Sequence, residues 1–238
     1  MRSKVIVFLI ILIIFFAIVL FFLFLGRSIF LVKHIEIKKD FKIDKEKLLK
    51  SLKIYPLRSI WEYDIEEMNN ELSKHVYLNE YKINKKYPST LVITMKIRKP
   101  VANVVGQKGN IYYIDKEGVI FMESNNSNTP LLIYDIRDNI KYGVEIKGKY
   151  KEIIDQLVYL KTNYLDLYNS ISQIEIFNNQ LNILDYILYF RTMNQKIYLK
   201  NQIDVDSINR ALSCVLFIKE KYSYAEKLLF TGNGFIVM

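Results

Sequence analysis

The most constraining feature of this chain is an apolar run near its amino terminus. From Val5 to Leu25 the sequence contains no charged or polar side chain. A helix of about 20 apolar residues is long enough to cross the roughly 30 Å hydrocarbon core of a bilayer. Everything after Gly26 is far more polar and has the patterning of a globular body. The sequence therefore predicts a single transmembrane helix over residues 5–25, with one water-exposed body behind it.

The flanks of this run distinguish an anchor from a cleaved leader. A secretory leader has an apolar core of about 7–15 residues and then a small-residue cleavage site, whereas Phe22–Arg27 contains no such site. Basic residues lie on both sides, with Arg2 before the run and Arg27 after it, so charge alone leaves the orientation open. A short basic tail before a first anchor is usually cytoplasmic, and a large body translocates largely regardless of its own charge. We therefore expect residues 1–4 in the cytoplasm and the body on the outer side of the inner membrane.

The charge balance indicates anionic surroundings. Lys and Arg number 34 against 25 Asp and Glu, a net charge of +9. The basic residues are scattered, and no long basic run is interleaved with aromatics that could stack on bases, so we expect no binding to nucleic acid. Anionic lipid or wall polymer is favoured over nucleic acid as a contact, and a simply solvated basic surface is favoured over both.

Nothing in the sequence has the spacing of a catalytic or metal site. The single cysteine, Cys214, lies in an apolar stretch and has no partner for an internal disulfide. The two histidines, His34 and His75, are far from it in sequence and do not form a metal-ligand pattern with it. Four carboxylates could supply a catalytic acid/base pair: Glu66, Glu67, Asp115 and Glu117. Positions on a helix surface or in a turn explain these residues without a catalytic pocket. We expect no enzyme activity, no cofactor and no metal.

The first part of the body has the periodicity of a compact α+β module. His34–Lys38 alternates apolar and polar residues, as a half-buried strand does. Asp44 and Asp64 each stand before a helical apolar pattern at a position typical of an N-cap. From Val76 the period changes to two and continues after a turn through Ile97. The predicted order is strand, helix, helix, strand, strand.

The remainder is predicted to be a mixed α/β region that ends in a hairpin. The last helix has Ile208, Leu212, Val215 and Leu216 at helical spacing, which predicts that these side chains share a buried face. The predicted strands are 111–121 as a hairpin, then 129–134, 171–177, 181–190 and 195–199, and the predicted helices are 150–163 and 204–221.

Three short stretches resemble a known bacterial family. They are Lys86 to Ile93 with its Pro-Ser-Thr-Leu, Arg98 to Ala102 with its Arg-Lys-Pro-Val-Ala, and the turn from Asp115 to Gly118. Together they resemble the POTRA domain and following hairpin of the FtsQ/DivIB division proteins. Two positions depart from that pattern, because Ile97 replaces a glutamate and Lys39-Asp40 replaces a glycine. The residues that match the POTRA motif are Pro88, Leu91, Ile93, Arg98 and Pro100.

The resemblance implies a domain plan and a set of partners. It implies a POTRA domain over 32–100 and a β domain over 101–238 with an antiparallel sheet and an exposed terminal strand. It also implies a non-catalytic divisome scaffold at the septum that regulates peptidoglycan synthesis, with other divisome members meeting the POTRA domain. FtsB/DivIC-like and FtsL-like single-pass proteins would bind by strand addition to positions near the carboxyl terminus, namely Phe230, Thr231, Gly234, Phe235, Ile236 and Val237.

Three alternatives remain open at this point. The terminal aromatic and apolar residues could be ordinary core of a hairpin rather than a docking edge. Another POTRA-bearing envelope assembly protein is possible, although a lone module behind an uncleaved anchor with no barrel pattern disfavours it. A membrane-tethered cell-wall hydrolase or transferase would need a catalytic constellation that the sequence does not contain.

Overall fold

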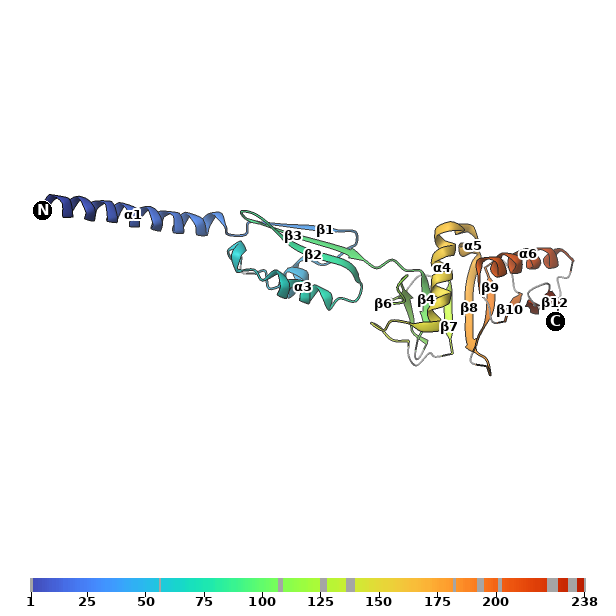
Figure 1. Ribbon diagram of the computed structural model, residues 1–238. Helices are drawn as coiled ribbons and strands as arrows, with labels where there is room; N and C mark the ends of the chain where they lie inside the picture. Colours follow the sequence, from blue (N-terminus) through green and yellow to red (C-terminus); the bar gives the residue numbers. More distant parts are fainter. Residues whose placement is uncertain are drawn as a thin grey trace. The chain divides into compact units, whose positions relative to one another are not determined.

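The computed structural model shows two compact units, Met1–Ile97 and Arg98–Met238, and each is described by itself (Figure 1). It describes residues 2–55, 57–106, 109–124, 128–135, 140–181, 183–191, 195–200, 203–221, 227–230 and 235–237. Within helices and strands, the side chains of residues 2–7, 22–28, 215, 218–221, 227, 230, 235 and 237 are outside this description.

The chain begins with a long helix, α1, over Arg2–Ile29. Its described side chains, from Phe8 to Phe21, are all exposed. In the portion of the chain covered by the description, no helix has both the length and the apolar character that crossing a membrane requires. The transmembrane helix over residues 5–25 stays a prediction.

The rest of the first unit is a three-stranded sheet covered by two helices. Strand β1 (His34–Lys39) lies parallel to β3 (Thr90–Ile97), and β3 pairs antiparallel with β2 (Leu78–Lys86). The helices α2 (Lys45–Ser51) and α3 (Ile65–Ser73) precede this hairpin in the chain. The predicted order of strand, helix, helix, strand, strand is confirmed.

Both predicted caps of these helices are confirmed. The Asp44 carboxylate accepts hydrogen bonds from the N–H groups of the first turn of α2, and Asp64 does the same for α3. Each cap satisfies backbone donors that have no partner within the helix. The helices bury Leu48, Leu72 and their apolar neighbours in one core with β3.

The two departures from the POTRA pattern meet in space. The Asp40 carboxylate accepts a hydrogen bond from the backbone N–H of Ile97 at 3.1 Å. Asp40 follows the end of β1, and Ile97 is the last residue of the neighbouring strand β3. The substitution for glycine therefore supplies a side chain that ties the ends of two adjacent strands together.

The second unit is built on a nine-stranded sheet with the order β12-β11-β10-β9-β8-β7-β4-β5-β6. The described part of this unit also contains a short 3-10 helix (Gly148–Lys151) and the α-helices α4 (Glu152–Asn163), α5 (Leu165–Ser170) and α6 (Val205–Lys221). Its strands are β4 (Ala102–Val105), β5 (Ile111–Ile114), β6 (Ile120–Glu123), β7 (Leu131–Tyr134), β8 (Ile171–Asn178), β9 (Leu184–Phe190), β10 (Lys196–Leu199), β11 (Lys227–Phe230) and β12 (Phe235–Val237).

The expectation of an antiparallel sheet is wrong for three strand pairs. Strands β4 and β7, β7 and β8, and β10 and β11 run parallel. A parallel pair needs a crossover connection, and α4 with α5 joins β7 to β8 while α6 joins β10 to β11. The predicted helices over 150–163 and 204–221 therefore lie in two of these crossovers, whereas the parallel strands β4 and β7 are connected through β5 and β6.

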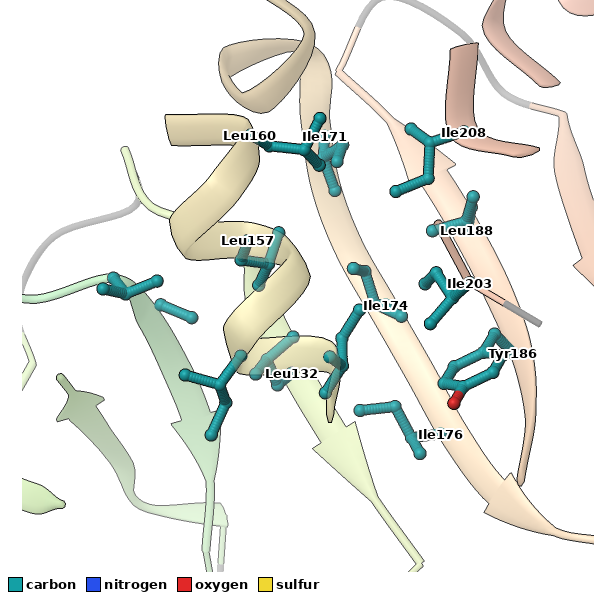
Figure 2. Close-up of a cluster of buried hydrophobic side chains, with 14 of the residues drawn as sticks. Leu132, Leu157, Leu160, Ile171, Ile174, Ile176, Tyr186, Leu188, Ile203 and Ile208 are labelled. Atoms are coloured by element: carbon teal, nitrogen blue, oxygen red, sulfur yellow. The ribbon is translucent and has the colours of Figure 1, made fainter. Parts of the chain in front are cut away.

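One face of this sheet makes the main core of the unit. Figure 2 shows Leu157 and Leu160 of α4 pointing toward Leu132 and Ile171 of the sheet. Ile208 of α6 is fully buried in the same core. Along β9 the burial alternates strictly between buried and half-buried residues. The helices therefore cover one face, while the side chains of β9 on the other face keep partial contact with solvent.

The predicted strand over 181–190 begins three residues too early. The Asn179 side chain accepts hydrogen bonds from the N–H groups of Leu181 and Ile183, which closes a turn before β9 begins at Leu184. Leu181 is exposed in this turn. An Asn side chain that bonds to the backbone just after it competes with strand pairing, so the apolar character of Leu181 was misleading.

The predicted hairpin over 111–121 is confirmed as β5 and β6, and its turn is packed against another segment. Gly118 has φ +88°, a left-handed conformation that glycine adopts readily. A Cβ at Gly118 would lie 2.6 Å from the carbonyl oxygen of Ile146. The Ile146 N–H also donates to the Gly118 carbonyl at 2.8 Å. Gly118 is therefore required both for its conformation and for its close backbone contact.

Replacement of Gly118 by alanine tests both its left-handed backbone and its close contact with Ile146. We expect Gly118→Ala to lower the free energy of unfolding by about 1–2 kcal/mol for the left-handed backbone and by about 1–3 kcal/mol more for the contact with Ile146. Gly109→Ala is the matched control, because Gly109 has φ +81° and no atom near the added Cβ. Thermal unfolding of the solubilised chain measures both variants, and equal losses would contradict the packing argument.

Candidate partner-binding site

The two edges of the nine-stranded sheet differ in how they are covered. At one edge, the Ile120 N–H of β6 donates to Val144 at 2.9 Å, and its carbonyl accepts from Gly143 at 2.7 Å. A loop therefore pairs with that edge. At the other edge, the sheet ends at β12 in the described part of the chain. An uncovered edge strand presents backbone donors and acceptors on which another chain can add a strand.

The terminal hairpin is held to the sheet by backbone pairing. Strand β11 runs parallel to β10, and β12 pairs antiparallel with β11. The pairs are Leu228 with Val237, Leu229 with Ile236, and Phe230 with Phe235. Leu228 is fully buried in the core of the unit. The predicted terminal hairpin is confirmed, and its inner strand is anchored by a core side chain.

The structure brings together four of the six residues predicted to bind partners. Phe230, Phe235, Ile236 and Val237 lie in the paired strands β11 and β12. Thr231 and Gly234 lie outside the described residues. Ile236 is 51 % exposed on the edge strand. A half-exposed isoleucine on a strand with an open edge is a suitable contact for an added strand, because such strands alternate their side-chain contacts.

Helix α6 has exposed apolar residues that sequence reasoning placed wrongly or missed. Asp204 caps it by accepting from the Ser207 N–H at 2.7 Å, as its predicted start requires. Leu216 was expected on the buried face but is exposed, and Phe217 beside it is exposed too. Ile208 and Ala211 alone among the described residues of α6's apolar face are fully buried. Helical spacing predicts a common face but does not say how far along the helix the core extends.

The Arg98 position of the POTRA motif forms a partly buried ion-pair cluster. Its guanidinium donates to the carboxylates of Asp115 and Glu117, the latter at 2.8 Å. The side chains of Arg98 and Asp115 are only 16 % and 4 % exposed. Burial disfavours the charged guanidinium, but the hydrogen bonds to both carboxylates outweigh burial and raise the pKa of Arg98. Arg98 is therefore a permanent cation fixed at the start of the second unit.

The Asp115 carboxylate also shapes the hairpin turn. Its Oδ1 accepts from the N–H groups of Glu117 at 2.9 Å and Val119 at 2.8 Å. Asp115 thus joins the Arg-x-Pro segment to the Asp-x-x-Gly turn, two motifs that lie apart in the sequence. This arrangement explains why these residue types occur together without any catalytic role for Asp115 or Glu117.

The segment after Arg98 is attached to the helices of the second unit. Lys161 of α4 donates to the Pro100 carbonyl at 2.7 Å, and the Tyr168 hydroxyl of α5 donates to the Val101 carbonyl at 2.6 Å. Burial lowers the pKa of Lys161, and the nearby Lys99 lowers it further. Burial raises the pKa of Tyr168 to about 12. Pro100 therefore lies in a structural junction rather than on an open surface.

The remaining residues of the POTRA motif lie in the core or in a turn of the first unit. Leu91 and Ile93 are fully buried in β3. Pro88 lies in the turn between β2 and β3, where the Tyr87–Pro88 peptide bond is cis. These positions account for the motif as packing and turn geometry.

The remaining candidate residues for metal binding and catalysis have the following surroundings in the structure. No group of three or more His, Cys, Asp or Glu among them could hold a metal ion. Cys214 is partly buried against the core, and burial raises the pKa of its thiol. Glu67 pairs with Lys53 at 2.7 Å on the surface of α3. Surface ion pairing therefore accounts for Glu67, and packing against the core accounts for Cys214.

Breaking the buried ion pair tests its structural importance. Arg98→Met leaves the Asp115 carboxylate buried without its cation, so we expect a loss of about 3–5 kcal/mol in the free energy of unfolding. Lys147→Met is the control, because its pair with Glu145 at 3.1 Å is exposed and worth about 0–1 kcal/mol. Hydrogen exchange of residues 115–119 and thermal unfolding measure both, and a small loss for Arg98→Met would contradict the structural role of the cluster.

Comparison with known proteins finds that the chain is similar to proteins named for cell division. Residues 30–96 match the family model described as "POTRA domain, FtsQ-type". The chain is 25% identical over 218 residues to cell division protein DivIB of Clostridium tetani, covering 86% of this chain and 78% of the relative. A similar match to DivIB of Clostridium acetobutylicum covers 86% of this chain and 81% of that protein at 25% identity. Cell division protein FtsQ of a Geobacter species is 30% identical over 101 residues, which is 41% of this chain and 36% of the relative.

Proposed function

From the homology of this chain to the DivIB and FtsQ cell division proteins over most of its length, we propose that it is a scaffold of the division machinery. It acts by binding other proteins rather than by catalysis. The observation that carries the proposal is a relationship that extends through both units, combined with a sheet that ends at a terminal edge strand. The relatives are named for cell division, which supports the same role here.

The amino-terminal helix is the proposed anchor. Residues 5–25 lack any charged or polar side chain, and the described side chains of α1 from Phe8 to Phe21 are exposed. A surface of this kind is unfavourable in water and favourable in hydrocarbon. The body then lies on the outer side of the cytoplasmic membrane at the septum.

Deletion of residues 1–29 tests the anchor. We expect the full chain to stay in the membrane pellet after alkaline carbonate extraction, and the deleted chain to move to the supernatant. Protease added outside cells without a wall should digest the body of the full chain. A full chain released by carbonate would refute the anchor, and a body protected from external protease would refute the orientation.

The terminal strand is the proposed docking edge for small single-pass partners of the FtsB/DivIC and FtsL type. Strand β12 is short and Ile236 is half-exposed, so the strand can pair further without displacing a core residue. The backbone supplies affinity in such a complex, and alternate side chains supply specificity. The domain plan of a POTRA domain over 32–100 and a β domain over 101–238 remains part of this proposal.

A charge on the edge strand tests the docking site. We expect Ile236→Asp to weaken binding of co-expressed DivIC-like and FtsL-like proteins by about tenfold, equivalent to about 1.4 kcal/mol. Leu181→Asp is the matched control, because Leu181 is exposed in a turn far from β12 in the strand order. A variant without residues 231–238 should lose binding altogether while keeping its circular dichroism spectrum. Equal binding by all four chains would refute the docking edge and leave the division role resting on homology alone.

A further inference from the structure

The first unit has a cluster of three aromatic rings, formed by the half-buried Phe30 and the exposed Trp61 and Tyr87. The ring centroids of Phe30 and Trp61 are 5.6 Å apart, and those of Trp61 and Tyr87 are 4.6 Å apart. Trp61 is 59 % exposed and Tyr87 is 50 % exposed. Exposed contiguous apolar surface of this kind marks an interaction site more often than single exposed residues do.

Backbone pairing holds Trp61 beside the end of α1. The Ile60 N–H donates to the Phe30 carbonyl at 2.7 Å, and the Val32 N–H donates to the Arg58 carbonyl at 3.1 Å. A β-bridge between Leu31 and Ser59 lies between these bonds. Because α1 ends at Ile29, Phe30, whose ring lies next to that of Trp61, is the first residue after the helix. The position of Trp61 next to this junction is therefore fixed by hydrogen bonds.

The turn that carries Tyr87 is attached to the same junction. The N–H groups of Lys33 and His34 both point to the Ser89 carbonyl, at 2.9 Å and 3.3 Å. Tyr87 and Ser89 belong to the turn between β2 and β3. Three separate segments of the chain thus bring an aromatic ring to the place where α1 joins the module.

The exposure of Trp61 is not a consequence of a disordered neighbourhood. Ile60 before it is fully buried, and Tyr63 two residues later is 3 % exposed. The Tyr63 hydroxyl donates to the Ile54 carbonyl at 3.0 Å and accepts from the Arg58 N–H at 3.1 Å. The segment is firmly held on both sides of Trp61, yet the indole faces outward.

Basic and acidic side chains both lie close to the cluster in the chain. The exposed residues Lys33 and Lys86 lie three residues after Phe30 and one residue before Tyr87 in the chain, and Glu36 lies 3.5 Å from the Lys86 ammonium group. Glu62 is the exposed carboxylate that adjoins Trp61. Arg27 adds a further positive charge in the sequence just before the junction. Each basic residue close to an anionic membrane surface contributes about 1 kcal/mol of attraction.

We propose that Phe30, Trp61 and Tyr87, together with Lys33 and Lys86, bind the headgroup layer of an anionic bilayer. The inference rests on the proposed anchoring of α1, because the proposed membrane span ends at Leu25, five residues before Phe30. Indole and phenol rings favour the boundary between hydrocarbon and water, where an apolar ring and a polar group are both satisfied. The lysines meet the lipid phosphates, and the POTRA module is held at the membrane surface rather than swinging freely from its anchor.

The intrinsic fluorescence of Trp61 provides the test, because Trp61 is the chain's single tryptophan. The full chain is reconstituted in vesicles of phosphatidylcholine with or without phosphatidylglycerol, and with lipids brominated near the headgroup end or near the methyl end of the acyl chain. We expect strong quenching by the shallow bromines, weaker quenching by the deep bromines, and protection of Trp61 from aqueous acrylamide. We also expect a larger blue shift of the emission with phosphatidylglycerol than without it.

The control moves the tryptophan to the opposite end of the same module. Tyr77 and Tyr87 flank the nine-residue strand β2, which spans roughly 30 Å at about 3.3 Å per residue. The double variant Trp61→Phe/Tyr77→Trp should show little quenching by either brominated lipid and no difference in emission between vesicles with and without phosphatidylglycerol. Equal lipid quenching at both positions would refute a specific contact of the cluster.

The experiment distinguishes failure of the headgroup contact from failure of the membrane anchor. If carbonate extraction shows that the full chain is inserted but Trp61 is quenched by acrylamide and not by brominated lipid, the headgroup contact is refuted while the anchor stands. If the full chain does not insert into vesicles, the anchor fails, and the proposal that depends on it fails as well. A blue shift that is equal with and without phosphatidylglycerol would refute the role of Lys33 and Lys86.

Discussion

Burial of one apolar sheet face under crossover helices is the constraint on which the second unit depends. Leu157 and Leu160 of α4 and Ile208 of α6 meet Ile171 and Leu188 of the sheet in this core (Figure 2). Each large apolar side chain buried in this way stabilises the unit by about 1.5–3 kcal/mol. The crossover through α4 and α5 allows β7 and β8 to run parallel, and the crossover through α6 allows β10 and β11 to do so. The terminal hairpin of β11 and β12 then lies at the end of the strand order. The position of the proposed docking edge thus follows from how the core is made.

The two ends of the sheet show how the same feature can be closed or left open. The edge at β6 is paired by the loop around Gly143 and Val144. At β12, the strand order ends with Ile236 half-exposed. Proteins usually block an edge strand because it invites association. Among the described strands, β12 is the last in the order, which is the arrangement on which the proposed docking edge rests.

The two units have different sources of rigidity at the positions that matter for the proposals. In the second unit, Arg98 and Asp115 tie the entering segment to a hairpin turn through charge and hydrogen bonds. In the first unit, Tyr63 holds the segment that presents Trp61. In both cases a buried polar group forms hydrogen bonds with its neighbours, and these bonds fix the position of the surrounding residues.

Local sequence patterns were enough to predict most of the individual elements of this protein. The caps at Asp44 and Asp64, the order of the first module and the hairpin at 111–121 all depend on hydrogen bonds and periodicities within a few residues. The POTRA motif was recognisable for the same reason. The motif positions Arg98 and Asp115 were predicted, but their ion pair was not, since a motif records residue types and not contacts.

The pairing of the strands and the exposure of particular apolar residues depend instead on long-range packing, which no local pattern records. The parallel pairs, the exposure of Leu216 and the bond from Ile97 to Asp40 each join or separate parts of the chain that are distant in sequence. The same is true of the rings of Phe30, Trp61 and Tyr87. Backbone pairing is much the same for most residue types, so strand order and register depend on the packing of the whole unit rather than on any short pattern.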